Sequence, residues 1–180
     1  TSERLGRGVI DARTAREAHF LVRDQVRRLP EEVRPASLQA LLQAFEATHF
    51  PVWPGAAVSL CRVDNNLLNV IRRPGPWASV DWENAGWGDP AFDFAQLMTH
   101  PAFIGVPGRR WAWVVGTYQN MMKDEGLGLR IRVYSRILAV WWVARTARFL
   151  YEWPSGLDRR LVDRPEGWEA ETRDKYQHYV

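Results

Sequence analysis

The 180-residue sequence is short of cysteine and of long apolar runs, and each shortage excludes a class of protein. A single cysteine, Cys61, excludes an internal disulfide and fits a reducing compartment. No apolar run reaches the roughly 20 residues that a membrane span requires, and the densest run, at 137–143, is soon followed by Arg145 and Arg148. The first residues carry no apolar signal core, so the sequence predicts a cytoplasmic protein that does not enter a membrane.

Lysine and net charge are also scarce. Only two of the 24 basic residues are lysines, and 21 acidic residues bring the net charge to +3, which is too small for a strong nucleic-acid footprint. The arginine pairs at 27–28, 72–73, 109–110 and 159–160 are scattered and are better explained as solvated surface. An arginine-rich nucleic-acid-binding domain is therefore the weakest interpretation. Apolar residues make up 46% of the chain, which excludes intrinsic disorder.

Helical periodicity runs through most of the chain. It predicts helices at 11–29, from 37 onward, and at 90–98, 109–123, 129–151 and 167–179, with Gly126 closing the fourth. Between them lie strand-like segments at 57–61, 67–72 and 77–81, the last two joined by the turn Pro74-Gly75-Pro76. The sequence therefore predicts a mainly α protein of the α+β class, with a small β insert in its first half.

The β insert contains residues suited to phosphoryl transfer. Asn69 follows Asp64 at the fifth position, and Asp81 ends the next predicted strand. Transfer from a nucleotide needs one carboxylate to orient or accept the proton of the attacking hydroxyl. It also needs an amide oxygen and a second carboxylate to hold Mg²⁺. The alternative is that Asp64, Asn65 and Asn66 only form a polar turn.

Two stretches resemble the aminoglycoside phosphotransferase and choline kinase family, which has a protein-kinase-like fold. Residues 60–71, LCRVDNNLLNVI, resemble the family's catalytic loop, VHGDLHPGNVL. Residues 79–95, SVDWENAGWGDPAFDFA, resemble the family's block IDWEFAGWGDPAFDLA over nearly its whole length. One short pattern arises by chance in many chains, but two blocks in the right order make the resemblance specific. The flanking helices match the C-terminal lobe of the family.

The resemblance implies a role for individual residues. Asp64 is expected to be the catalytic base, and Asn69 and Asp81 are expected to be the ligands of Mg²⁺. Asp93 is expected to receive backbone N–H groups of the catalytic loop and so support its shape. Glu83 follows Asp81 closely enough to reach the metal through water, and is the weakest candidate. ATP or another nucleoside triphosphate is the implied phosphoryl donor.

The sequence departs from the family pattern in two ways. Arg62 and Val63 stand where the family has histidine and glycine, so Arg62 takes the position that supports the catalytic loop from below. In addition, a kinase of this type uses an upstream strand lysine and a nucleotide-covering loop, whereas Lys123 and Lys175 both follow Asp81.

These observations predict one domain over residues 1–180, the C-terminal lobe of the kinase-like fold without its N-terminal nucleotide lobe. Its catalytic and metal-binding block is expected at 58–95 and its helical, substrate-side region at 96–180. Such a lobe alone is expected to be inactive.

The predicted function is that of the catalytic and substrate-binding lobe of an ATP-dependent O-phosphotransferase. Its partners would be a nucleotide and a small molecule with an aminoglycoside-, choline- or sugar-type hydroxyl, with no nucleic acid or membrane. A non-catalytic, pseudokinase-like binding module is the alternative, suggested by Arg62 and the missing lobe. Retention of the three polar residues of the β insert favours the enzyme. Glu125, Trp111 and Trp113 are candidates for the acceptor pocket, but neither the acceptor nor the oligomeric state follows from the sequence.

Other chemistries have less support. The four histidines show no paired spacing for zinc, and no second cysteine is present to help hold one. Cys61 is predicted to lie on a strand beside the active loop, where a small buried core residue is more common than a nucleophile. The sequence has no Gly-x-Ser-x-Gly elbow, which argues against an α/β-hydrolase.

Overall fold

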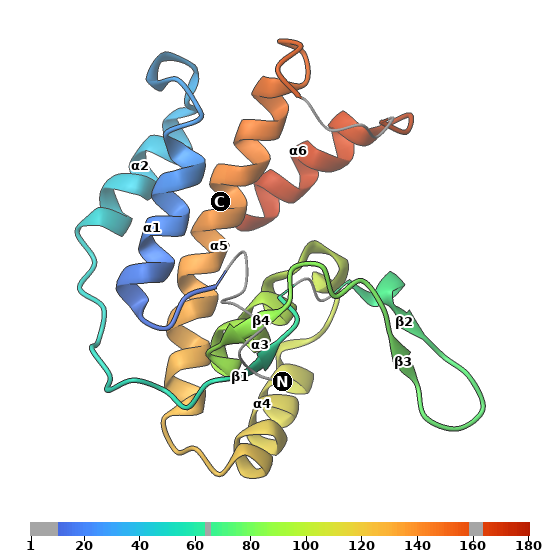
Figure 1. Cartoon of the computed structure of the whole chain (residues 1–180). Helices are drawn as coiled ribbons and strands as arrows, with labels where there is room; N and C mark the ends of the chain where they lie inside the picture. The colour runs from blue at the N-terminus through green and yellow to red at the C-terminus, as the bar shows by residue number, and fades with distance from the viewer. Residues whose placement is uncertain (1–10, 64–65, 159–163) are drawn as a thin grey trace. The chain divides into compact units, whose positions relative to one another are not determined.

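The computed structural model describes residues 11–63, 66–158 and 164–180 (Figure 1). In these ranges the chain forms six α-helices: α1 (Ala15–Val26), α2 (Ala36–Glu46), α3 (Pro90–Thr99), α4 (Gly108–Met122), α5 (Leu127–Glu152) and α6 (Trp168–Tyr179). The strands are β1 (Ser59–Cys61), β2 (Val70–Ile71), β3 (Ala78–Ser79) and β4 (Gly86–Gly88). The 3-10 turns are η2 (Glu31–Val33), η3 (Leu67–Asn69) and η4 (Pro101–Phe103). The predicted mainly helical α+β character is confirmed.

The described residues divide into two compact units. The first comprises residues 11–18 and the described part of 51–136, and the second comprises 19–50 and the described part of 137–180. Both sequence blocks with catalytic potential fall in the first unit. That residues 1–180 form a single kinase-like lobe stays a prediction. Among the described residues, no helix combines the length and apolarity needed to cross a membrane.

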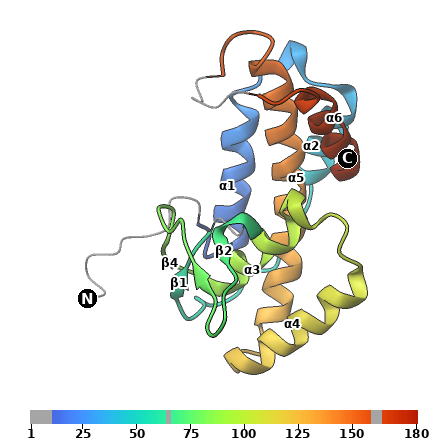
Figure 2. The same cartoon turned by 90° about the vertical axis from the view of Figure 1, so that its right-hand side faces the viewer.

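Two small antiparallel sheets organise the first unit. β1 pairs with β4 through Ser59↔Gly88, Leu60↔Trp87 and Cys61↔Gly86, and α3 lies against β1 (Figure 2). The second sheet is the β2–β3 hairpin, with Val70↔Ser79 and Ile71↔Ala78 in register. The chain thus crosses from one sheet to the other between β1 and β2, which is where the predicted catalytic loop lies.

Position 88 requires a glycine because the side chain of Asp11 lies close to its Cα atom. A Cβ atom placed there would lie 2.6 Å from Asp11 Oδ1, well inside van der Waals contact. This crowding explains the glycine at the end of β4, a strand that sequence periodicity did not predict. Such a strand has weak intrinsic propensity, and its position is set by pairing with β1.

Apolar side chains of α2, α5 and α6 form the core of the second unit. Its buried members are Leu29, Leu38, Val143, Ala147 and Tyr176. The Ser37 and Tyr176 hydroxyl groups share a 2.7 Å hydrogen bond, so the start of α2 is tied to α6. The helical stripes that the sequence showed in these segments are therefore packing surfaces.

Several predicted boundaries were wrong, for identifiable local reasons. The first helix begins at Ala15 instead of residue 11, because the Thr14 hydroxyl accepts the Glu17 backbone N–H at 3.1 Å. The fourth helix, predicted over 109–123, ends at Met122 as α4, but Lys123 with its left-handed φ of 52° closes it, where Gly126 was expected to do so. The strand predicted at 67–72 is only Val70–Ile71, because η3 occupies its first half.

Candidate active site

The two predicted metal ligands face each other at the open end of the β2–β3 hairpin. Asn69 ends η3 directly before β2, and its carbonyl accepts the Val80 N–H at 3.0 Å, one step beyond the strand pairs. Its side-chain Nδ2 donates to Asp81 Oδ2 at 3.0 Å. The structure therefore brings Asn69 and Asp81 together, although they are twelve positions apart in the sequence. Asp64, the predicted base, lies outside the described residues.

The backbone at Asp81 is unusual. The predicted strand 77–81 ends at Ser79, and Asp81 adopts φ 62° in the left-handed region. Aspartate tolerates this conformation better than most residues, because its short polar side chain bonds locally. Glu83 lies exposed in the turn that follows, and no contact places it beside Asp81. Its role as a water-mediated ligand stays a prediction.

A carboxylate of α3 holds the start of the predicted catalytic loop. Val63 adopts φ 70°, and its backbone N–H donates to Asp93 Oδ1 at 2.8 Å. The left-handed conformation explains why the resembled family has glycine at this position. For a β-branched residue it costs on the order of 1–3 kcal/mol. The Asp93 contact and burial of the Val63 side chain, which is 5% exposed, offset that strain. This contact is of the kind that the resemblance implies for Asp93.

Arg62 is buried beneath the same loop. Its Nη1 donates to Ser79 Oγ at 2.9 Å, which joins the end of β1 to the end of β3. The side chain is only 8% exposed, and its Nε and Nη2 atoms have no hydrogen-bond partner among the described residues. A histidine would bury fewer donors here, so Arg62 introduces an electrostatic cost that the family pattern avoids.

Replacing Arg62 by methionine is expected to raise the free energy of unfolding by about 1–3 kcal/mol, because two unsatisfied buried donors disappear. Arg148→Met is the matched control. Arg148 is 9% exposed, but it donates to Gln25 at 2.6 Å and pairs with Glu152 at 3.0 Å. Its loss should lower the free energy of unfolding. Urea denaturation followed by circular dichroism measures the free energy of unfolding of both variants. A large loss of stability in Arg62→Met would show that the Arg62 guanidinium has hydrogen-bond partners in solution.

A buried ionic network fixes the N-terminus of α3. The Asp89 carboxylate is fully buried and caps the helix by accepting the Ala91 N–H at 2.9 Å. It also accepts from Arg130 Nε at 2.9 Å, from Arg130 Nη2 at 3.2 Å and from the Tyr134 hydroxyl at 3.1 Å. Arg130 donates in addition to Asp124 Oδ2 at 2.8 Å.

The pKa values reflect this network. Burial opposes the charge of Arg130, but hydrogen bonds to Asp124 and Asp89 raise the pKa of its guanidinium above the usual value. The Arg130 hydrogen bond lowers the pKa of Asp124. Burial, with the charge of Asp89, raises the pKa of Tyr134. The arginine is therefore charged and the tyrosine is a permanent hydrogen-bond donor at neutral pH.

Sequence analysis missed Asp89, Arg130 and Tyr134. One signal was available: Arg130 lies on the apolar stripe of α5, beside Ile131 and one turn before Tyr134. An arginine on a buried stripe predicts a buried acidic partner. The sequence could not identify that partner, because Asp89 is 41 positions away.

Cys61 behaves as a core residue. It lies in β1, is 2% exposed, and burial followed by the nearby charge of Asp93 raises its thiol pKa to about 12. A thiol with this pKa stays protonated near neutrality and is a poor nucleophile. The predicted placement of Cys61 on a buried strand is confirmed.

The residues proposed for the acceptor pocket differ in their surroundings. Trp111 packs edge-on against Phe94 and Phe103, with ring centroids 6.4 and 6.0 Å apart, so it contributes to packing. Trp113 is 71% exposed on α4. Glu125 lies in the connection to α5, where its carbonyl accepts from Gln119 Nε2 at 3.1 Å. Their role in acceptor binding stays a prediction.

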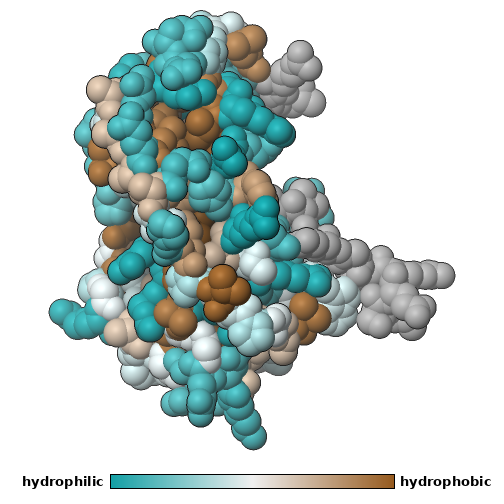
Figure 3. Space-filling model, turned by 90° about the vertical axis from the view of Figure 1, so that its left-hand side faces the viewer, coloured by the Kyte–Doolittle hydropathy of each residue, from teal (hydrophilic) through white to brown (hydrophobic). Residues whose placement is uncertain are grey.

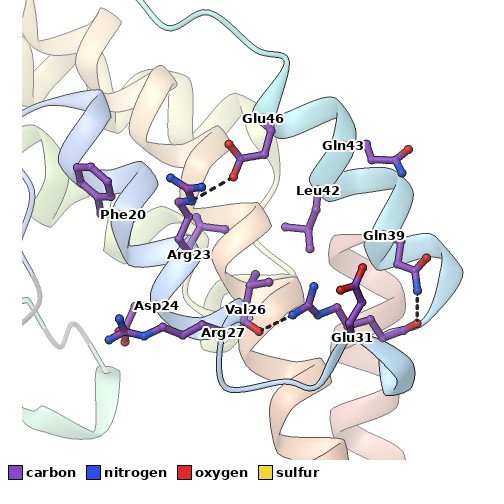
Figure 4. Close-up of a pocket in the computed structure, with 12 residues that line it drawn as sticks. Phe20, Arg23, Asp24, Val26, Arg27, Glu31, Gln39, Leu42, Gln43 and Glu46 are labelled. Carbon is purple, nitrogen blue, oxygen red and sulfur yellow. Dashed lines mark hydrogen bonds and ion pairs between the residues drawn. The ribbon is translucent and has the colours of Figure 1, made fainter.

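A hollow of about 830 Å³ lies in the second unit, between α1 and α2 (Figures 3 and 4). Phe20, Val22, Val26 and Leu42 supply its apolar lining. Several of its charged groups bond to one another or to the backbone: Arg23 approaches Glu46 at 3.5 Å, for example, and Figure 4 draws this ion pair. None of the predicted site residues line the hollow.

Comparison with known families decides the assignment. The family model of the phosphotransferase enzyme family matches residues 6–118, which is more than half of the chain and includes both sequence blocks. The chain belongs to the phosphotransferase enzyme family. The predicted resemblance is thereby confirmed, although the match ends within α4. No curated protein and no solved structure matches the chain.

Proposed function

We propose that this member of the phosphotransferase family is the catalytic and substrate-binding lobe of an ATP-dependent small-molecule kinase. The observation that carries the proposal is the 3.0 Å contact between Asn69 and Asp81 at the open end of the β2–β3 hairpin. An amide and a carboxylate at that spacing, in a phosphotransferase, are suited to the metal that accompanies the nucleotide. The proposed acceptor is a hydroxyl group of an amino alcohol, a sugar or an aminoglycoside.

The donor set fits Mg²⁺. Carboxylate and amide oxygens are hard ligands, and Mg²⁺ is usually held by one or two carboxylates together with substrate phosphates and water. Among the described residues, no group of three or more histidine, cysteine, aspartate or glutamate side chains could hold a metal by itself, so the proposed site depends on substrate phosphates and water for its remaining ligands. Asn69 presents Nδ2 to Asp81, so its amide must rotate to offer Oδ1 as a ligand. When bound, Mg²⁺ neutralises phosphate charge.

Asp64 is the proposed general base. The acceptor oxygen forms a bond to the γ-phosphorus, the bond between that phosphorus and the β–γ bridging oxygen breaks, and the hydroxyl proton passes to the Asp64 carboxylate. Asp93 supports this step indirectly, because it holds the N–H of Val63, which directly precedes Asp64. The products are ADP and a phosphate monoester.

Turnover is expected to need a further, nucleotide-covering part of the protein. The hairpin and its flanks expose several large apolar side chains around Asn69 and Asp81, namely Leu68, Ile71, Trp77, Val80 and Trp82. A two-stranded hairpin on its own is marginally stable in water, so these side chains favour a folded partner that covers them. The proposal therefore assigns turnover to the complete protein and expects little from the 180-residue chain alone.

Asp81→Asn is expected to weaken Mg²⁺-dependent ATP binding by about tenfold or more, since even outer-shell partners of a metal contribute on that scale. Asp174→Asn, which removes an exposed carboxylate of α6 outside the proposed site, is the control and should change the affinity little. Isothermal titration with ATP, in Mg²⁺ and in EDTA, measures both. Equal affinities for the parent and Asp81→Asn in Mg²⁺ would remove Asp81 from the metal site.

The non-catalytic binding module remains the second candidate because of Arg62, whose buried guanidinium replaces the usual histidine. The two candidates differ in one observable. The module binds a nucleotide or small molecule but transfers no phosphoryl group, even as the complete protein with a broad panel of hydroxyl acceptors.

A further inference from the structure

We propose that Arg130 is a positioning residue of the catalytic loop, acting through Asp89 and α3. The inference rests on the proposed function, because it assigns the loop a shape that phosphoryl transfer needs. Arg130 lies beyond the segment that matches the phosphotransferase family, on the first turns of α5. The connection has three steps, all within the first unit.

The first step joins Arg130 to Asp89. The Nε and Nη2 atoms of the guanidinium meet the two carboxylate oxygens side by side, at 2.9 and 3.2 Å. The Arg130 side chain is 6% exposed and that of Asp89 is fully buried. A two-point contact between planar groups fixes orientation as well as distance, which one hydrogen bond does not. The Tyr134 hydroxyl adds a third fixed donor.

The second step joins Asp89 to Asp93. Asp89 caps α3, and the Phe92 and Asp93 N–H groups donate to the Asp89 carbonyl at 2.9 and 3.2 Å. Asp93 is thus held one helical turn from the cap. Any displacement of Asp89 moves or frays the first turn of α3, because the N–H groups of that turn have no other partner within the helix.

The third step joins Asp93 to the loop, through the 2.8 Å bond from the Val63 N–H. That bond holds a valine in a left-handed conformation, which relaxes readily when the support is lost. The loop is therefore more sensitive to the position of α3 than a glycine-containing loop would be. The bonds of the Arg130 side chain to described residues go to Asp89 and Asp124, and its proposed influence on the loop is transmitted through Asp89.

Charge balance makes Arg130 necessary in this place. Burial, followed by the charges of Asp93, Asp11 and Asp89, raises the pKa of the Cys61 thiol, so three carboxylates lie within electrostatic reach of this buried residue of β1. Arg130 is the guanidinium that bonds directly to Asp89 there, and Asp124 binds its far side at the start of α5. Without Arg130, Asp89 would lose the guanidinium that bonds to both of its carboxylate oxygens, which is costly for a buried charge.

Amide hydrogen exchange, read by NMR on the 180-residue chain, tests the proposal. Arg130→Gln should lower the protection of the Val63 amide about tenfold or more relative to the ladder amides of β1 and β4 in the same unit. Arg130→Lys should recover part of it, because the charge remains. Arg132→Gln, which removes an exposed arginine from the same helix, is the matched control and should leave Val63 unchanged.

Two results would overturn the positioning role. Unchanged protection at Val63 in Arg130→Gln would show that α3 holds the loop alone. A loss shared equally by Val63 and the ladder amides would show that Arg130 only stabilises the unit. If Arg130→Gln does not fold, Tyr134→Phe takes its place, since it removes one donor to Asp89 and should also act selectively on Val63.

The complete protein supplies a second readout. Arg130→Lys should lower kcat while the KM for ATP changes little, because the loop is displaced and the nucleotide ligands are retained. Equal effects of Arg130→Lys on kcat and on the KM for ATP would contradict the proposal. An inactive parent protein, with Asp81→Asn leaving ATP binding unaltered, would remove the proposed function, whereas the exchange result at Val63 would still decide whether Arg130 positions the loop.

Discussion

Asp64→Asn lowers turnover of the complete protein by about 10²-fold or more, if Asp64 accepts the proton of the acceptor hydroxyl. Asparagine keeps the size and hydrogen-bonding capacity of the side chain but cannot take up the proton. ATP affinity should change little, since the proposed metal ligands Asn69 and Asp81 are intact. Steady-state kinetics with a panel of amino alcohols, sugars and aminoglycosides, together with ATP titrations, measure the two quantities.

Asp174→Asn is the control for this experiment, because Asp174 is an exposed carboxylate on α6. It should leave both turnover and affinity unchanged. Undiminished turnover in Asp64→Asn would exclude Asp64 as the base. The binding module would be favoured if the parent protein transfers no phosphoryl group to any member of the panel. In that case neither substitution should change turnover.

Asp89→Ala lowers the free energy of unfolding by about 3–5 kcal/mol, the scale on which breaking a buried ion pair destabilises a protein. The substitution removes the cap of α3 and leaves Arg130 and Tyr134 without their buried acceptor. Urea denaturation measures the change. Arg130 keeps its contact with Asp124, so its charge does not lose every partner.

An exposed ion pair provides the control. Arg173 approaches Glu169 at 2.6 Å on the surface of α6, and Glu169→Ala should change the free energy of unfolding by only about 0.5 kcal/mol. A loss below about 1 kcal/mol in Asp89→Ala would show that the Asp89 network contributes little to stability. Combining Asp89→Ala with Arg130→Leu should cost less than the two single losses added, because the second change removes the charge that has lost its buried acceptor.

Local signals were sufficient to predict the helices from the sequence. Pro90 at the first position of α3 and the apolar stripe of α5 identified those helices to within two residues at each end. Where a prediction failed, a local contact explains it, as with Lys123, whose left-handed backbone ends α4 before Gly126. No propensity rule predicts a non-glycine residue in that conformation.

The candidate site was only partly predictable. Asn69 and Asp81 were found because the family motifs contain them, and the structure places them in contact. Arg130 belongs to no motif, and its function depends on a partner that is distant in the sequence. The left-handed Val63 was also hidden, since valine favours extended backbone and only the fold requires φ 70° there.

The most direct test of the proposed site uses Mn²⁺ as a paramagnetic substitute for Mg²⁺. In the presence of ATP, small additions of Mn²⁺ should first broaden the backbone NMR signals of Asn69, Val80 and Asp81, and Asp81→Asn should abolish this selectivity. Broadening that begins instead at the exposed acidic residues of α6, Glu169 and Glu171, and that is the same in Asp81→Asn, would contradict a metal site at the β2–β3 hairpin.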